Sequence, residues 1–468
     1  MLTFVGSLNS QPLSLTDHFD RMRPSPPFFP RFPLLALVAI VGCCGALGCD
    51  VPIAKFQPNT IYFARIEKSQ GADLQPVGRV TVVSDTQSAL EDLFGTPDRP
   101  QWPEFAEHEA ELAALVDLER LERAAGAVRS DEADQHFGLY REHCASCHGV
   151  TGDGMGPTSR FLNPYPRDFR LGKFKFKTTP IGKKPTRNDL RRVLTEGLMG
   201  TSMPSFRRLK DDEFEALVDY VIYLSVRGQV ERRLLTEAAV ELDYETGDRL
   251  YDTSLSESNS DLFKAQLDRI SKAVNDVAQQ WSQANFAVTN VPEPPANLPL
   301  HSNFRNLLDG DSDQLAASIT RGRKLFQGPI ANCASCHGAT AMGDGQTNNY
   351  DAWTKDWTEG IDPQNKDQLL PFLKLGALEP RFILPRNLRT GVYRGGSTSS
   401  DLYLRIVNGI DGSPMPATAM QPANPQGLTE TDVWDLVNFL LSLPYEAISK
   451  DAAISAPTHA LNASIPSL

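Results

Sequence analysis

Cysteine is scarce in this chain, and it has no long hydrophobic run. Only seven of the 468 residues are cysteine, and three of these, Cys43, Cys44 and Cys49, lie near the N-terminus. The other four fall in two short motifs, described below, so none is left in the bulk of the chain for a disulfide framework. The longest uncharged apolar run covers residues 34–48, which is too short to cross a bilayer comfortably. The formal net charge of −12 argues against nucleic acid as a partner.

The N-terminal 48 residues have the layout of an export signal. Three arginines precede the apolar run, an order of charge typical of signal peptides. The run ends in Ala46-Leu47-Gly48-Cys49, which resembles a bacterial lipoprotein cleavage box, although leucine is commoner than alanine at the first position. We therefore predict a signal peptide at 1–48, lipidation of Cys49, and a location at the periplasmic side of a bacterial membrane. An uncleaved anchor, a plain secretory signal and a start at Met22 remain open alternatives.

The remaining four cysteines form two copies of Cys-x-x-Cys-His, at residues 144–148 and 333–337, with the same inner Ala-Ser. In c-type haem attachment, two cysteines at this spacing form thioether bonds to one porphyrin, and the adjacent histidine ligates the iron. A lone Cys-x-x-Cys also fits a zinc knuckle or a redox dithiol, but here each pair carries its own histidine. We therefore predict two covalently bound haem c groups. Their attachment residues are Cys144, Cys147, His148, Cys333, Cys336 and His337, with the two histidines as proximal iron ligands.

The region around the second motif repeats the region around the first in three separate blocks. Pro166-Arg167 corresponds to Pro385-Arg386, and Met203-Pro204 corresponds to Met415-Pro416. In the third block, apolar stripes of helical spacing close both regions. The largest difference in length is an insertion around residues 343–379. Residues 131–228 are called the first repeat below, and residues 311–446 the second repeat.

A haem iron needs a distal ligand as well as the proximal histidine. Each repeat offers three methionines downstream of its motif: Met155, Met199 and Met203 in the first, and Met342, Met415 and Met420 in the second. Only Met203 and Met415 occupy matching positions, each after a Gly-rich loop and before a proline. Such a position is poor for a methionine that merely fills a core. We therefore predict Met203 and Met415 as iron ligands, an arrangement suited to passing electrons rather than activating a substrate.

Further residues around the two haems are predicted from the same repeat. A ligating histidine usually donates its other N–H to a carbonyl, and the loop 152–157, with Pro157 fixing its turn, is placed to supply one to His148. The second repeat has no matching proline, so the same role is doubtful for His337. Arg167 and Arg386 recur in both repeats and are predicted to bind haem propionates through charge-assisted hydrogen bonds. A surface ion pair is the alternative for both arginines.

Basic residues crowd the stretch 173–192 of the first repeat, in an otherwise acidic chain. One interpretation is a docking surface for an acidic redox partner, and another is a contact with the acidic second half of the same chain. An ordinary solvated face is the third alternative.

At these residues the chain resembles the monohaem cytochrome c domain family, twice over. The resemblance rests on Cys-x-x-Cys-His, the Gly-x-Gly loop after it, Met-Pro downstream and a closing amphipathic helix. It covers about half of the chain. It implies an all-α fold that wraps each haem between N- and C-terminal helices and exposes one porphyrin edge. Members of the family carry single electrons between respiratory complexes or serve as haem subunits of dehydrogenases and oxidases.

The predicted fold class is therefore all-α, with two tandem cytochrome c domains joined by a helical linker and a small N-terminal segment of unknown fold. In that segment, 61–63 and 81–83 are expected as short strands, 95–100 as a linker and 104–128 as a helix. The predicted organisation is a signal peptide at 1–48, an N-terminal segment at 49–130, cytochrome c domains at 131–228 and 311–446, a helical linker at 229–310 and a disordered tail at 447–468.

The predicted function is that of a membrane-tethered dihaem electron carrier outside the cytoplasm, with redox proteins as donor and acceptor, and not of an enzyme. One alternative is a dihaem cytochrome c peroxidase, in which at least one iron must open to peroxide. Another is a haem subunit of a quinol-oxidising or terminal-oxidase complex. In that case the N-terminal segment, the linker and the insertion with Trp353 and Trp357 are assembly surfaces.

Overall fold

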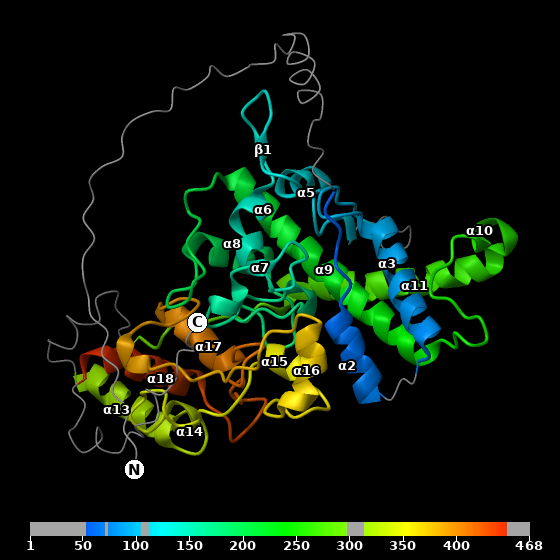
Figure 1. Cartoon of the computed structure of the whole chain (residues 1–468). Coiled ribbons are helices and arrows are strands. Elements are labelled where there is room, and N and C mark those ends of the chain that lie inside the picture. The colour runs from blue at the N-terminus through cyan, green and yellow to red at the C-terminus, as the bar shows by residue number, and fades with distance from the viewer. Residues whose placement is uncertain (1–52, 71–73, 104–111, 297–312, 447–468) are drawn as a thin grey trace, which may run out of the picture. The chain divides into compact units, whose positions relative to one another are not determined.

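The computed structural model describes residues 53–70, 74–103, 112–296 and 313–446. The predicted signal peptide, the predicted lipidation site Cys49 and the predicted disordered tail lie outside these ranges. The described residues fall in one compact unit, and nearly all their regular structure is helical, as Figure 1 shows. Within them, one small antiparallel sheet pairs β1 (Arg129–Ser130) with β2 (His136–Phe137). The all-α prediction is therefore confirmed.

The N-terminal segment is helical, so the two short strands expected there are wrong. Helix α2 covers Thr60–Gln70, and helix α3 covers Pro76–Phe94. In α3 the buried residues Val82, Leu90 and Phe94 recur at helical spacing over nearly the whole element. The strand prediction at 81–83 depended on three consecutive β-branched residues, a window too short to show the helical period.

The expected single helix over 104–128 is also wrong within the described residues. Helix α5 covers only Leu118–Ala124, and it begins where the Asp117 side chain accepts a hydrogen bond from the backbone N–H of Arg120. A local cap therefore sets its start.

The two repeats share five elements in the same order, and the second adds α15 (Ala352–Trp357) and α16 (Lys366–Lys374) between its motif turn and η4 (Leu388–Thr390). The first repeat contains α6 (Leu139–His143), α7 (Ala145–His148), η1 (Ser159–Phe161), η2 (Phe169–Leu171), α8 (Arg187–Glu196) and the beginning of α9 (Asp211–Glu241). The second repeat contains α13 (Asp313–Gln327), α14 (Ala334–His337), α15, α16, η4, α17 (Ser399–Asn408), α18 (Glu430–Ser442) and η5 (Leu443–Tyr445). Helices α8 and α17 both begin with a capping box, formed by Thr186 with Asp189 and by Thr398 with Asp401.

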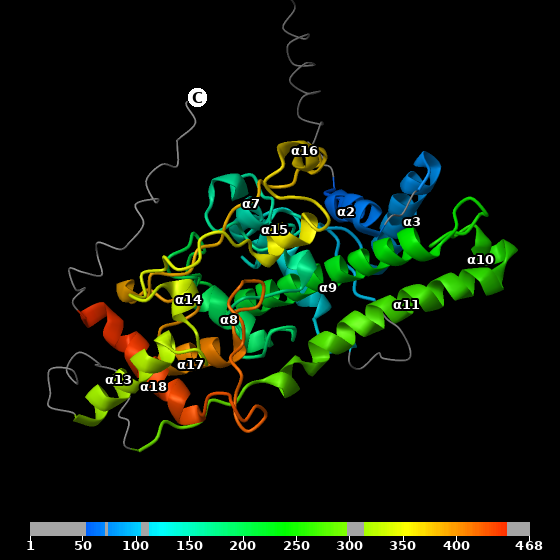
Figure 2. The ribbon, with the colours of Figure 1, turned by 90° about the horizontal axis from the view of Figure 1, so that it is seen from below.

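The helical linker is confirmed, and it begins inside a helix of the first repeat. Helix α9 passes residue 228 without a break. It is followed by α10 (Leu255–Ser258), α11 (Ser260–Ser282) and η3 (Gln283–Ala287). Helix α11 returns along α9, as Figure 2 shows, and buries Val274 and Trp281 in the same core as α9. The linker therefore extends the core of the first repeat rather than acting as a free spacer.

The insertion of the second repeat packs against the N-terminal segment. Trp357 and Phe372, from α15 and α16, share a buried apolar cluster with Ile61 of α2. Asp356 of α15 pairs with Arg232 of α9 at 2.7 Å. Helix α15, which carries both Trp353 and Trp357, is thus covered by the chain itself. No helix among the described residues combines the length and the apolar character that a membrane span requires.

Candidate functional site

Each Cys-x-x-Cys-His motif forms a single helical turn. The backbone N–H of His148 bonds to the carbonyl of Cys144 at 2.9 Å, and the N–H of His337 bonds to the carbonyl of Cys333 at the same distance. This turn brings the first cysteine and the histidine, four positions apart, onto one face of the helix. In both motifs, the cysteines are free of disulfides. The turn thus presents both sulfurs and the imidazole together.

The environment of the cysteines does not favour thiolate chemistry. Burial raises the pKa of Cys144 to about 12 and that of Cys333 to about 11. A redox dithiol needs a lowered pKa, because the thiolate is the reactive form. Among the described residues, no group of three or more histidine, cysteine or acidic side chains is placed to hold a metal ion, so a four-ligand zinc knuckle is not formed either.

Both proximal histidines are oriented by a backbone carbonyl. The Nδ1 atom of His148 donates to the carbonyl oxygen of Arg167 at 3.0 Å, and that of His337 donates to the carbonyl oxygen of Arg386 at 3.1 Å. Burial lowers the pKa of both imidazoles, which favours their neutral form. With Nδ1 carrying the proton, the lone pair of Nε2 is free to bind iron.

These bonds correct the predicted acceptor for His148, which was the loop 152–157. The N–H of Gly154 in that loop donates to the carbonyl of His148 at 2.9 Å, and the N–H of Gly343 does the same for His337 at 2.8 Å. The loop therefore supplies donors to the end of the motif turn, where carbonyls lack helical partners. The doubt about His337 is also removed, because its bond matches that of His148 although no proline matches Pro157.

The loops that carry Met203 and Met415 are built alike. The N–H of Leu198 bonds to the carbonyl of Met203 at 3.0 Å, and the N–H of Ile410 bonds to the carbonyl of Met415 at 3.1 Å. A glycine precedes each loop, and a Cβ on Gly197 would lie only 2.6 Å from the backbone of the Met-Pro segment. Ligation by the two methionines stays a prediction, now with matched loops to support it.

Surroundings alone do not separate the other methionines from this pair, because Met203 itself packs against the core of the first repeat. The side chain of Met199 is 62% exposed. Met155 packs against the cluster formed by α2 and the insertion, and Met420 packs against the core of the second repeat. Met342 is half-buried. None of the four has a counterpart at the matching position of the other repeat.

Arg167 and Arg386 were predicted to bind propionates, and the structure places their backbone carbonyls beside the two histidines. Both residues are partly exposed, and neither forms an ion pair within the described part of the chain. Arg386 has one side-chain bond, to the carbonyl of Val392 at 3.2 Å, and its Nε atom is buried without a partner. The alternative of a surface ion pair is therefore not realised, and propionate binding stays a prediction.

Two further cations at matching positions were missed as site residues. Lys175 follows Phe174 in the first repeat, and Arg394 follows Tyr393 in the second. Burial, followed by the neighbouring positive charge of Arg167, lowers the pKa of Lys175 to about 7. The comparison of the two repeats that indicated Arg167 also pairs Lys175 with Arg394, but the sequence prediction placed Lys175 only in the basic stretch.

Much of the basic stretch is used inside the molecule. Lys177 pairs with Asp411 at 3.2 Å, and Arg192 pairs with Asp401 at 2.5 Å, so both reach the second repeat. Arg187 instead pairs with Asp219 of α9 at 2.5 Å. Of the three interpretations of this stretch, contact with the acidic second half of the chain therefore describes these residues best.

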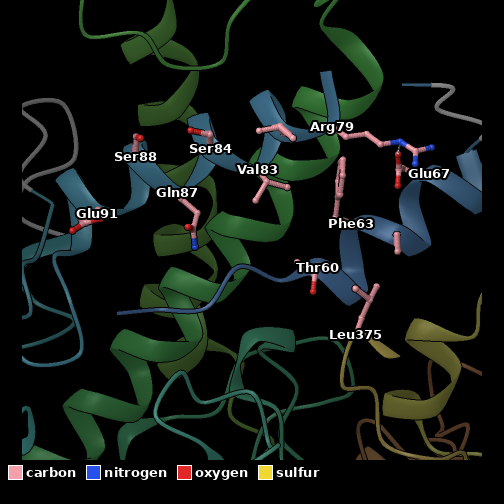
Figure 3. A pocket seen from close by; sticks show the side chains of 12 residues that line it. Thr60, Phe63, Glu67, Arg79, Val83, Ser84, Gln87, Ser88, Glu91 and Leu375 are labelled. Carbon is pink, nitrogen blue, oxygen red and sulfur yellow. Dashed lines mark ion pairs between the residues drawn. The ribbon is translucent and has the colours of Figure 1, made fainter. Parts of the chain in front are cut away.

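A surface pocket of about 620 Å³ lies between α2 and α3 (Figure 3). Glu67 and Arg79 form an ion pair of 2.7 Å at one end, and Leu375 of the second repeat contributes to its lining. Its lining contains none of the predicted haem residues.

The donor set of each repeat fits a covalently bound haem c. Each has two free thiols on one turn, a neutral imidazole with a free Nε2 and a methionine on a matched loop. Cys144, Cys147 and His148 would hold the group in the first repeat, and Cys333, Cys336 and His337 would hold it in the second.

Comparison with known proteins bears on these sites. The family model Cytochrome c matches residues 137–225 and 319–444. The sequence matches none of the curated proteins. A solved structure, described as a reducing HAO-like protein complex of Kuenenia stuttgartiensis, contains a similar chain. The two chains are 22% identical, the match covers 65% of this chain and 94% of that chain, and the TM-score is 0.39.

This likeness contradicts the prediction that the chain is not an enzyme. HAO-like proteins, that is, those like hydroxylamine oxidoreductase, are an enzyme family, so the prediction is corrected. At this TM-score the likeness assigns no reaction to the chain.

The two matched regions coincide with the two repeats, and each has its own attachment turn, oriented histidine and methionine loop. Cytochrome c domains imply covalently bound haem c and haem electron transfer. Residues 137–225 and 319–444 are therefore two tandem regions that match the cytochrome c family.

Proposed function

We propose that this protein is a dihaem c-type cytochrome that passes single electrons between redox proteins outside the cytoplasm. One observation supports this above the others: both repeats orient their proximal histidine by the same bond, from Nδ1 to the carbonyl of Arg167 or Arg386. Two equivalent sites in one compact unit suit a relay between two irons.

Haem, when bound, supplies a one-electron iron couple. The chain's own residues set the conditions for that couple. The thiols would hold the group in place, and the imidazole and the methionine sulfur of the matched loop would serve as its iron ligands. Thioether is a weak donor that favours the reduced state, so both potentials are raised relative to a second imidazole.

The proposal includes export and a lipid tether on Cys49. The support is the sequence before this residue, namely an apolar run that ends in a lipoprotein-like box. The full chain with Cys49→Ser should shift from the membrane fraction to the soluble periplasmic fraction of a haem-c-competent bacterial host. A variant that stays with the membrane would show that Cys49 is not the tether.

The ligand assignment is tested by Met203→Ala and Met415→Ala in the full chain. Each substitution should remove about half of the sulfur-to-iron charge-transfer absorption of the oxidised protein and lower one of two midpoint potentials, because one thioether ligand is lost. Met199→Ala is the matched control, since Met199 lies exposed on the same loop as Met203. It should leave both the spectrum and the potentials unchanged.

Haem content is measured on the same preparations from the absorption of the pyridine derivative and from bound iron. We expect two haems and two irons per chain. One haem per chain would overturn the dihaem proposal, and unchanged spectra in both alanine variants would overturn the methionine assignment.

A further inference from the structure

Four cations gather where the two repeats meet. They are Arg167 and Lys175 of the first repeat and Arg386 and Arg394 of the second, and they form what we call the cationic seam. The Nζ atom of Lys175 lies 3.9 Å from a carboxylate oxygen of Asp351, a residue of the second repeat. Positive charge from Arg394 and from Arg167 acts on Lys175, and positive charge from Arg386 acts on Arg394.

The arginines of the seam reach across to the methionine loop of the opposite repeat. A Cβ on Gly412, three residues before Met415, would lie 3.3 Å from Nη1 of Arg167. A Cβ on Gly200, three residues before Met203, would lie 3.0 Å from Nη2 of Arg386. Arg394 also donates to the carbonyl of Gly200 at 3.3 Å.

Arg167 and Arg386 therefore each contact both sites. Through its carbonyl each arginine orients the histidine of its own repeat, and through its guanidinium group it lies against the methionine loop of the other repeat. Each repeat thus places one arginine against the methionine loop of the other repeat.

Among the described residues, the seam has fewer carboxylates than cations. Three carboxylates act on Arg167, those of Asp351, Asp168 and Asp411, but each is nearer to another cation. Asp351 faces Lys175, Asp168 binds Arg170 at 3.0 Å, and Asp411 binds Lys177 at 3.2 Å.

The arginines of the second repeat are no better compensated. The Nε atoms of Arg386 and Arg394 are buried and have no hydrogen-bond partner in the described part of the chain. Burial of like charges side by side is unfavourable unless anions neutralise them. The missing partners are carboxylates or another oxyanion, which guanidinium groups bind by paired hydrogen bonds.

We propose that the cationic seam is one shared site for the propionate carboxylates of both haems. The inference rests on the proposed function, because the carboxylates come with the two haems. Each haem then has cations of both repeats beside its propionates. Reduction or oxidation at one site changes the field at the other through these shared charges.

The test is a spectroelectrochemical titration of the haem-loaded full chain and of Arg386→Gln, Arg394→Gln and Lys175→Gln. Loss of a seam cation should lower both midpoint potentials, because a nearby positive charge favours the reduced iron. Arg381→Gln is the matched control. Arg381 also belongs to the second repeat and bonds to the first, at the carbonyls of Leu162 and Arg160, but it lies outside the seam. It should leave both potentials in place.

The outcomes separate this inference from the proposed function. Two haems per chain with only one potential lowered in each seam variant would mean private propionate sites and would overturn the shared seam. Potentials unchanged in all three variants would overturn it as well. Fewer than two haems in the unsubstituted chain would instead overturn the proposed function.

Inorganic phosphate distinguishes propionates from a free oxyanion. If propionates fill the seam, adding phosphate at constant ionic strength should leave the potentials unchanged in the unsubstituted protein. A phosphate-dependent shift that disappears in Arg394→Gln would show an open anion site and would overturn the proposal. If Arg386→Gln yields too little protein, Lys175→Gln and Arg394→Gln provide the same readout.

Discussion

The two repeats build the same attachment turn on different helical supports. In the second repeat, α13 has fifteen residues and packs across α18, and the buried residues form a core cluster of their own. In the first repeat, α6 has only five residues. There the core is continuous with residues of α2, α3 and α11, as part of one larger cluster. The first site is therefore supported by the N-terminal segment and the linker, whereas the second is supported mainly within its own repeat.

The close approach between elements also differs. In the second repeat, Gly322 of α13 lies against the backbone of Asp435 in α18. In the first, Gly228 of α9 lies against Arg170. What both repeats share at the helix contact is an aromatic pair, with ring centroids 4.8 Å apart for Tyr140 and Tyr220 and 5.3 Å apart for Phe326 and Phe439. The hydrogen bonds of the site are thus repeated more closely than the packing that supports them.

The largest effect is expected from Gly322→Ala, which forces α13 and α18 apart. A Cβ at this position would lie 2.0 Å from the carbonyl oxygen of Asp435, a backbone atom that cannot rotate away. We expect a loss of roughly 2–3 kcal/mol in the free energy of unfolding, even after the gain of about 1 kcal/mol in helix propensity. Thermal unfolding followed by haem absorption and by circular dichroism measures it.

Two other glycines sharpen this test. Gly228→Ala should destabilise the protein to a similar extent, since its Cβ would lie 2.5 Å from the Cα of Arg170. Gly78→Ala in α3 is the control, because its Cβ would make only ordinary contacts, the nearest at 3.6 Å. If Gly322→Ala unfolds like the Gly78→Ala control, the close contact between α13 and α18 is not as described.

A pH effect should distinguish the repeats, because Asp168 in the first stands where Asn387 stands in the second. Both side chains accept a bond from the N–H two residues on, at 2.9 and 3.0 Å. Burial raises the pKa of Asp168 from 3.8 to about 6, although Arg170 opposes this shift. The folded state then holds a proton that the unfolded state has already lost. Stability should therefore fall as the pH rises from about 4 to about 6.

Asp168→Asn removes this titration while keeping an oxygen for Arg170 and for the backbone N–H. The variant should lack the corresponding change in unfolding free energy, which is roughly 2 kcal/mol over that interval. Denaturant titrations of both proteins at several pH values provide the comparison. The difference between their unfolding free energies removes the contributions of all other acidic groups, which the two proteins share. Identical pH profiles would show that Asp168 keeps an ordinary pKa in the folded state.

The haem sites were more accessible to sequence reasoning than the supports around them. The chemistry of haem attachment requires Cys-x-x-Cys-His, a pattern that is complete within five residues. Aligning the two copies of the repeat then pairs Arg167 with Arg386 and Met203 with Met415. The carbonyl acceptor could not be found in this way. It lies 19 residues after His148 but 49 after His337, and only the fold brings the two segments together.

The N-terminal helices were missed for a different reason. The period of α3 becomes visible only over Val82 to Phe94, and no local signal shows that α2 will bury Ile61 against Trp357, almost three hundred residues away. Likewise, each cation of the seam is ordinary in sequence, and the shortage of carboxylates around its three arginines appears only when the two repeats are packed together. Local chemistry was readable from the sequence, whereas charge balance across an interface was not.

The smallest expected effect concerns how the closing helix of each repeat begins. Thr429 caps α18 reciprocally with Asp432, through bonds of 3.1 and 2.9 Å. Lys210 stands at the matching place before α9, and only one of the two capping bonds forms there. Its backbone N–H donates to the Glu213 carboxylate at 2.9 Å, but its side chain cannot accept a bond in return, because an ammonium group has no acceptor. Lys210→Thr should therefore stabilise the protein by about 0.5–1 kcal/mol.

Lys210→Ala is the control, since it removes the positive charge from the helix N-terminus without adding an acceptor. A higher denaturation midpoint for threonine than for alanine isolates the cap. Equal midpoints would mean that charge, and not the missing acceptor, distinguishes this helix start from that of the second repeat.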